Sequence, residues 1–162
     1  MKKFELTTEF ITNMFEKKLF RIKALVEFGN VKAGELGGYV EKEENVSQDG
    51  NAWVSGDAEV SGNARVSGNA RVYGDAWVSG NARVSGDADY ALVQGFGTEF
   101  RCTTFYRGKN KKIMVNCGCF HGDLEGFRKQ VKETRNGKIA KEYLMIADLM
   151  EYHFTSEDSS NE

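Results

Sequence analysis

Two thiols and an imidazole stand at alternate positions of the chain, at Cys117, Cys119 and His121. On an extended strand these side chains would share one face, and this set of ligands suits zinc. The spacing is uncommon for zinc, however, and Ile113 and Val115 fall on the same face. Two thiols buried against a following helix explain the same residues. We therefore predict no metal ion and no cofactor.

A second set of candidate residues precedes the valines of a six-residue repeat, where side chains point outward from the strands. Its members are Trp53, Glu59, Arg65, Arg71, Trp77, Arg83 and Asp89. Guanidinium groups pair with phosphate, and an aromatic plane can stack on a base. The ligand-binding residues that we predict are Trp53, Arg65, Arg71, Tyr73, Trp77 and Arg83. The alternative is an interface between protomers, and the two roles are compatible.

The repeat itself must position these side chains. Valine recurs every six residues from Val54 to Val84, alanine stands two residues before each valine, and each corner reads Gly-Asn or Gly-Asp. Residues two apart face the same side of a strand, and Gly-Asn and Gly-Asp favour turns. A corner every six residues closes a triangle in about 18, so coils stack at the roughly 4.8 Å spacing of paired strands. Side chains 18 residues apart then form columns: Trp53 with Arg71, Glu59 with Trp77, and Arg65 with Arg83.

Weaker copies of the repeat extend upstream. Val40 and Val46 are six residues apart, whereas Val46 and Val54 are eight apart, which predicts a two-residue insertion near Gln48 to Gly50. The solenoid should therefore contain about three coils, from near residue 34 to Tyr90. Such a short stack leaves two open ends that need caps.

Read from valine, the unit Val-Ser-Gly-Asn-Ala-Arg resembles the hexapeptide repeat of left-handed β-helix proteins. The resemblance implies left-handed winding and a homotrimer. We expect a mainly β protein, with a short left-handed parallel β-helix of about three coils between an N-terminal β cap and a C-terminal unit of a β-hairpin and two α-helices. The expected division is 1–33 for the cap, 34–94 for the β-helix, 95–154 for the C-terminal unit and 155–162 for a disordered tail.

On either side of the repeat, alternating apolar residues predict strands and apolar residues at helical spacing predict helices. Expected N-terminal strands are Phe4–Thr8, Glu9–Thr12 and Leu19–Val26. The C-terminal hairpin should pair Thr103–Arg107 with Ile113–Phe120. Asp123 is placed to cap a helix that ends at Thr134, and a second helix should run from Ile139 to Phe154.

The order of these parts resembles a group of phage and prophage hexapeptide-repeat proteins that are often labelled transferases. This chain and the group share the same order of parts: N-terminal strands, a degenerate Gly-Gly coil, uniform hexads, and a cysteine-bearing hairpin followed by helices. The group has no settled activity that the resemblance could transfer.

Many left-handed β-helix proteins are acyltransferases that use a histidine on a coil as the base, because the nucleophile must lose a proton near neutral pH. This chain has two histidines, His121 and His153, and both lie outside the predicted coils. Asp57 and Asp87 stand at corner positions of the repeat. We therefore predict a protein that is not an enzyme, with no catalytic residues, and keep an acyltransferase as the alternative.

Composition restricts the partners and the compartment. The net charge is −2, and no segment carries the basic excess of a general nucleic-acid binder. No apolar run approaches the roughly 18 residues that cross a membrane, and the N-terminus lacks the order of a signal peptide. Three cysteines do not suggest a secreted disulfide framework. We expect a cytoplasmic protein, in the host cytoplasm if a phage encodes it.

Together these observations favour a non-catalytic trimeric binding protein. It would sequester a small anionic, nucleotide-like ligand or block a host defence protein; a structural trimerisation stem is a further alternative. Basic residues of the C-terminal unit are either a solvated surface or a docking patch for a host protein. These are Arg107, Lys109, Lys111, Lys112, Arg128, Lys132 and Arg135.

Overall fold

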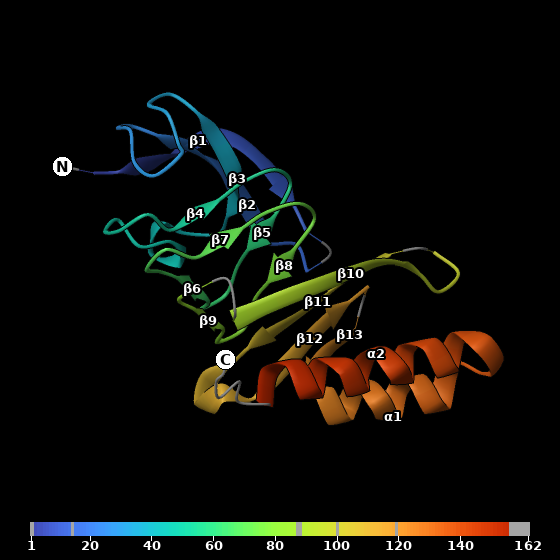
Figure 1. Ribbon diagram of the computed structural model, residues 1–162. Helices are drawn as coiled ribbons and strands as arrows, with labels where there is room; N and C mark the ends of the chain where they lie inside the picture. The colour runs from blue at the N-terminus through green and yellow to red at the C-terminus, as the bar shows by residue number, and fades with distance from the viewer. Residues whose placement is uncertain (1, 14, 87–88, 100, 119, 156–162) are drawn as a thin grey trace.

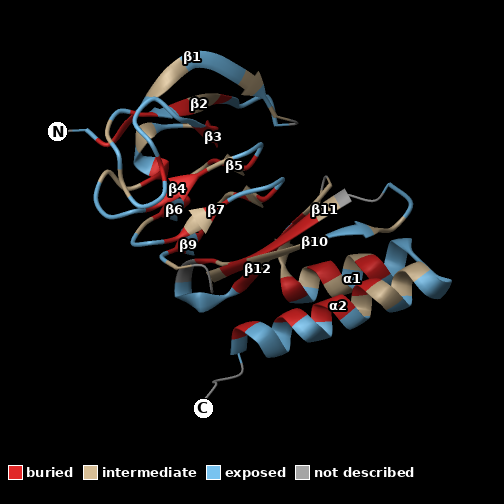
Figure 2. Cartoon of the chain, turned by 45° about the horizontal axis from the view of Figure 1, so that its top comes forward, coloured by how far each residue is buried: buried red, intermediate tan, exposed pale blue. Residues whose placement is uncertain are grey.

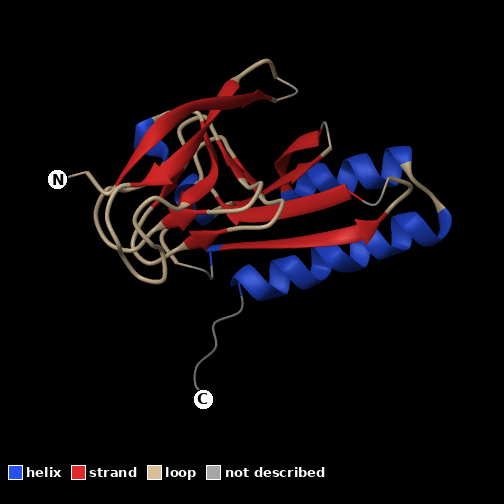
Figure 3. Ribbon diagram, turned by 90° about the horizontal axis from the view of Figure 1, so that it is seen from above, coloured by secondary structure: helices blue, strands red, loops and turns tan. Residues whose placement is uncertain are grey.

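The molecule stacks a hairpin, a solenoid, a sheet and a helix pair in the computed structural model, which describes residues 2–13, 15–86, 89–99, 101–118 and 120–155 (Figure 1). An N-terminal hairpin lies over one end of a β-solenoid, and a four-stranded antiparallel sheet lies across the other end. Two helices cover the far face of that sheet (Figure 3). The fold is therefore mainly β, with two C-terminal helices, as predicted.

Seven short strands build the solenoid. They are β3 (Leu36–Val40), β4 (Trp53–Val54), β5 (Glu59–Val60), β6 (Arg65–Val66), β7 (Arg71–Val72), β8 (Trp77–Val78) and β9 (Arg83–Val84). The strands β4 and β7, β5 and β8, and β6 and β9 pair in parallel, each with a partner 18 residues away. The three ladders are the three sides of the coil. The predicted columns of side chains are thereby confirmed.

The core of the solenoid consists of the repeated alanine and valine side chains. From Ala52 to Val84 these residues are at most 1% exposed, and they appear as the red interior in Figure 2. Burying each valine contributes about 1.5–3 kcal/mol. Only the coil above or below can bury them, so stability depends on stacking.

The upstream insertion is also present. Val40 pairs with Val60 and Val46 with Val66, an offset of 20 residues instead of 18. A short 3-10 helix, η1 (Glu43–Asn45), lies in this part of the first coil. The two-residue insertion predicted from the valine spacing is confirmed.

The N-terminal cap extends one side of the solenoid. Strands β1 (Phe4–Thr12) and β2 (Lys18–Ala24) form an antiparallel hairpin, and β2 pairs antiparallel with β3. The resulting sheet has the order β1-β2-β3-β5-β8. The first two predicted strands form one strand, with an irregular register between Leu6 and Phe10.

The C-terminal unit contains four strands where the sequence predicted a two-stranded hairpin. They are β10 (Tyr90–Phe96), β11 (Arg101–Arg107), β12 (Ile113–Cys117) and β13 (Phe120–Asp123), with a 3-10 turn, η3 (Lys109–Lys111), before β12. Tyr90 packs in the solenoid core, but its backbone pairs with Tyr106 of β11. The chain thus leaves the last coil directly into the sheet, and β10 runs across the expected boundary between residues 94 and 95.

The two predicted helices are α1 (Leu124–Thr134) and α2 (Gly137–Thr155). Asp123 caps α1 by accepting a hydrogen bond from the Gly126 N–H at 2.8 Å. The buried face of α1 consists of Leu124, Phe127 and Val131. The expected disordered tail lies outside the described residues beyond Thr155. Within the described part of the chain, no helix has the length and apolar character that crossing a membrane requires.

Side chains satisfy the backbone groups that the open ends of the solenoid would leave unpaired. At the N-terminal end the Lys3 ammonium donates to the carbonyls of Ala52 at 2.8 Å and Gly50 at 3.3 Å. At the other end Thr104 Oγ1 accepts from the Trp77 N–H at 3.0 Å, and Asn116 Nδ2 donates to the Trp77 carbonyl at 2.9 Å. Buried backbone groups without such partners would cost about 1–3 kcal/mol each.

The corners provide a matched test of coil stacking. Gly68 and Gly74 both have positive φ, 62° and 69°. A Cβ at Gly68 would lie 2.5 Å from the Ser85 carbonyl oxygen, whereas a Cβ at Gly74 would meet no atom within 4 Å. Gly74→Ala should cost about 1–2 kcal/mol, the backbone penalty alone, and Gly68→Ala at least about 1 kcal/mol more. Urea unfolding measures both, and equal costs would contradict the stacking.

Lys3 should give the stability of the protein a distinctive pH dependence. Its side chain is 4% exposed, and burial lowers the pKa of its ammonium from 10.5 to about 8. The unfolded chain therefore holds this proton more tightly than the folded one, so the free energy of unfolding should rise between pH 8 and 10. Relative to Lys3→Met, the wild type should gain stability across this range in urea unfolding. Parallel pH profiles for the two proteins would refute this role of Lys3.

Candidate ligand-binding site

The two arginines of the β6 and β9 side lie one above the other. Arg65 pairs directly with Arg83, so their Cα atoms are about 4.8 Å apart. Nη1 of Arg83 donates to the carbonyls of Asn63 at 2.9 Å and Ala82 at 3.1 Å. Among the described residues, Arg65 makes no hydrogen bond or ion pair through its guanidinium. We call this pair the arginine ladder; it keeps several donors available.

A hollow of about 490 Å³ adjoins the arginine ladder. Lys42 borders it and donates to Asn63 Oδ1 at 3.1 Å, and Asn81 stacks one coil below Asn63. Glu44 is the single carboxylate among its lining residues. With three cationic and two amide side chains, the hollow offers mainly donors and positive charge. The sequence prediction included both arginines but missed Lys42 and the two asparagines, although asparagine or aspartate follows the glycine at every corner of the repeat.

Trp53 was predicted to be an exposed ligand-binding residue, and this prediction is wrong. Its side chain is 1% exposed. It points outward from the solenoid, but Phe4 and Phe28 of the N-terminal cap cover it edge-on, with ring centroids 6.2 and 5.3 Å away. Trp53 therefore joins the cap to the solenoid and is not available to a ligand.

Trp77 is half-buried on the β5 and β8 side. Phe15 from the tip of the N-terminal hairpin packs against its ring at 5.7 Å between centroids. The neighbouring hollow of about 210 Å³ is also lined by Glu59, Asp75 and Cys102. Burial and the nearby Asp57 raise the pKa of the Glu59 carboxyl. This side carries carboxylates and a thiol, so it does not suit an anion.

Arg71 lies beside Trp53 on the β4 and β7 side, and Tyr73 follows β7. Tyr73 is 58% exposed, and its ring meets that of Tyr90 edge-to-face at 6.3 Å. The Tyr90 hydroxyl donates to the Arg71 carbonyl at 2.6 Å. The six predicted ligand-binding residues are thus divided among three sides. The structure pairs Trp53 with Arg71 and Arg65 with Arg83, but Trp53 is buried, so only Arg65 and Arg83 form an accessible pair.

Cys117 and His121 lie on two neighbouring strands, β12 and β13, instead of one strand. Cys117 pairs with Phe120 and Asn116 with His121 across β12 and β13, so Cys117 and His121 fall on opposite faces of the sheet. Cys117 packs toward the helices and accepts from the Thr103 hydroxyl at 3.1 Å. Cys119 lies outside the described residues. In the part that the structure describes, no three metal-binding side chains gather in one place.

His121 lies against the solenoid, a position that its place in the sequence did not predict. Its Nδ1 is 2.5 Å from Asn116 Oδ1, and its Nε2 borders the corner at Gly80. Burial lowers the pKa of the imidazole, which favours its neutral form. The Asn116 amide also donates to Ser79 Oγ at 3.0 Å. This polar cluster joins the sheet to the last coil.

The fold and this site define a β-solenoid repeat protein with a basic flank. The family model for the YdcK Beta solenoid repeat matches residues 58–74 and 64–80. The matched windows contain β5 to β8 and Arg65 of the ladder. No curated protein matches the chain.

Truncating Trp53 should reveal its role in joining the cap to the solenoid. Trp53→Ala removes a fully buried indole and should lower the free energy of unfolding by about 3–5 kcal/mol. Tyr73→Ala removes an exposed ring from the same side and should cost less than about 1 kcal/mol. Chemical denaturation measures both values. A small cost for Trp53→Ala would show that the cap does not depend on this residue.

Proposed function

We propose that this β-solenoid is a non-catalytic binding protein that captures a small anionic, nucleotide-like ligand at the arginine ladder. The observation that carries the proposal is the direct stacking of Arg65 on Arg83 with donors to spare. Like charges at this separation repel each other, and an anion between them removes the repulsion. Guanidinium groups offer paired donors that match the oxygens of phosphate.

The ladder is also a part of the solenoid flank that other elements leave open. Phe4 and Phe28 cover Trp53 on one side, and Phe15 packs on Trp77 on another. Arg65 and Arg83, by contrast, are exposed. Lys42, Asn63 and Asn81 add donors around the same hollow. The described side chains of this flank suit recognition of an anion.

The lining of the hollow supports binding more than catalysis. It contains no histidine and no thiol among the described residues, and arginine and lysine remain protonated at neutral pH. General-base catalysis of acyl transfer needs a group that accepts a proton near neutral pH. His121 borders Gly80, at the end of the solenoid away from the N-terminal cap, and does not line this hollow.

Further parts of the proposal rest on the resemblance of the repeat to hexapeptide proteins. They are left-handed winding, a homotrimer and a phage origin, with sequestration of a defence signal or blocking of a host defence protein as the biological role. The threefold arrangement would place the flanks of neighbouring solenoids side by side. An arginine ladder in the cleft between two such flanks would gain contacts from a second protomer.

Titration calorimetry and thermal shift with a panel of ADP, ADP-ribose, cyclic dinucleotides and pyrophosphate test the ladder. We expect at least one of these to bind, and Arg65→Ala or Arg83→Ala to weaken it by about 10-fold or more, because each removes a charge-assisted contact of about 1.5–3 kcal/mol. Arg65→Lys should retain part of the affinity, since it keeps the charge and loses the fork.

Arg135→Ala is the matched control, because this arginine is exposed in the helical layer and should leave affinity unchanged. Failure of every probe to stabilise the protein would refute the small-ligand proposal. Release of free thiol from acetyl-coenzyme A with a common acceptor, abolished by His121→Ala, would instead establish the acyltransferase alternative.

A further inference from the structure

The outer face of α2 carries an apolar stripe that nothing in the described chain covers. Met145 is 60% exposed, Leu149 58% and Tyr152 69%. Their spacing of four and three residues places all three on one face of the helix. In Figure 2, exposed residues in pale blue recur along α2 between buried residues in red. Of the eight large apolar side chains that are exposed in the described residues, three are therefore on one helix face.

This stripe is not needed to hold α2 in place. The opposite face already packs on α1 and the sheet, through Tyr143, Ile146, Ala147, Met150 and Phe154. A helix anchored by one apolar face normally has a polar outer face. A contiguous exposed apolar patch on such a helix is typical of an interaction surface.

We propose that the stripe pairs with the same stripe of a second copy of this chain, with the two α2 helices antiparallel. A twofold axis on the exposed face, level with position 147 along the helix, would bring Met145 of each copy against Leu149 of the other. The same arrangement would bring Lys141 beside the C-terminal turn that carries Glu151 and Tyr152. Such an isologous contact needs only one self-complementary surface.

The charges along α2 favour the antiparallel direction. Its N-terminal half carries Lys138, Lys141 and Glu142, a net charge of +1, with Glu142 3.9 Å from Lys138. Its C-terminal half carries Asp148 and Glu151, a net charge of −2. Antiparallel pairing sets the basic half of each copy against the acidic half of the other, whereas parallel pairing sets like charges together. The helix dipoles have the same preference.

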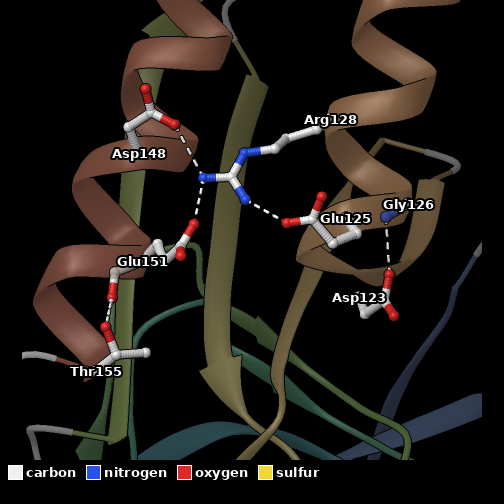
Figure 4. A network of polar contacts seen from close by, with 7 residues as sticks. All are labelled: Asp123, Glu125, Gly126, Arg128, Asp148, Glu151 and Thr155. Atoms are coloured by element: carbon white, nitrogen blue, oxygen red, sulfur yellow. Dashed lines mark hydrogen bonds and ion pairs between the residues drawn. The ribbon is translucent and has the colours of Figure 1, made fainter.

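Arg128 of α1 fixes the acidic half of this surface. Its guanidinium donates hydrogen bonds to the carboxylates of Glu125 at 2.5 Å, Asp148 at 2.9 Å and Glu151 at 2.6 Å (Figure 4). The Arg128 side chain is only 14% exposed, while the side chains of Asp148 and Glu151 are 75% and 53% exposed. One cation against three carboxylates leaves the region negative, and the contacts hold α1 and α2 together as a single rigid surface.

The area of this surface sets the expected affinity. A helix of 19 residues is about 28 Å long. Pairing along it buries less than the roughly 800 Å² per partner of a standard interface, so a dissociation constant in the micromolar range is expected. The contact is twofold and uses the helical layer, so it is independent of ligand capture and of a threefold contact between solenoids. The protein would be a dimer, or a hexamer if the solenoid also forms a trimer.

Light scattering on the full chain, across the micromolar range, provides the test with two complementary variants. Met145→Glu and Leu149→Lys should each halve the mass and weaken self-association by about 10-fold or more, because each buries a charge against an apolar group. An equimolar mixture of the two should restore the mass. In the antiparallel arrangement the carboxylate introduced at position 145 of one chain meets the ammonium introduced at position 149 of the other, whereas a parallel arrangement would leave both charges unpaired.

Leu36→Glu is the matched control, since Leu36 is 51% exposed on β3 and far from α2 in the sequence; its mass should not change. Circular dichroism and melting temperature establish that each variant is folded. The proposal is overturned if either helix variant keeps the wild-type mass, if the mixture stays dissociated, or if Leu36→Glu has the same effect.

Discussion

An open-ended parallel solenoid leaves unpaired backbone donors and acceptors at its first and last coils, and the rest of this structure depends on how they are satisfied. Inside the stack each coil pairs with the next, so the problem exists only at the ends. In a solenoid of about three coils, the ends are a large share of the whole. The sequences that flank the repeat are therefore part of its stability.

The two ends are closed in different ways. At the N-terminal end one side continues as the antiparallel strands β2 and β1, while Lys3 and Asn45 supply donors to coil carbonyls where no strand follows. At the C-terminal end Thr104 and Asn116 provide Trp77 with the acceptor and donor that another coil would have provided. Side chains of the antiparallel sheet thus make the hydrogen bonds that the backbone of a further coil would make. The other face of the sheet is then free to hold the two helices.

The features that follow from the six-residue period were predictable from the sequence. Ala and Val pairs two residues apart had to face inward, and the 18-residue columns followed from the six-residue corner. The sequence did not predict the environment of Trp53, because Phe4 and Phe28 reach that side chain from distant parts of the chain. The expectation that Cys117 and His121 would share one face of a strand was wrong for a local reason. Gly118, with φ of 60°, lies in the turn between β12 and β13, so the two residues are on different strands. Within the candidate site, the two arginines were predictable from the column rule. Lys42 was not, because it lies in the irregular first coil.

Closure of the ends also decides which surfaces are left for recognition. The N-terminal hairpin is attached to the β3-β5-β8 side, and its residues Phe4 and Phe15 pack on Trp53 and Trp77 of the outward columns. The arginine ladder is on the β6 and β9 side, which this hairpin does not extend. The apolar stripe of α2 lies in a layer that the four-stranded sheet separates from the solenoid (Figure 1). A ligand on the ladder and a second copy on α2 would therefore not compete for the same atoms. Pairing through α2 would increase the number of ladders per particle without altering any of them, which suits a protein that acts by capture.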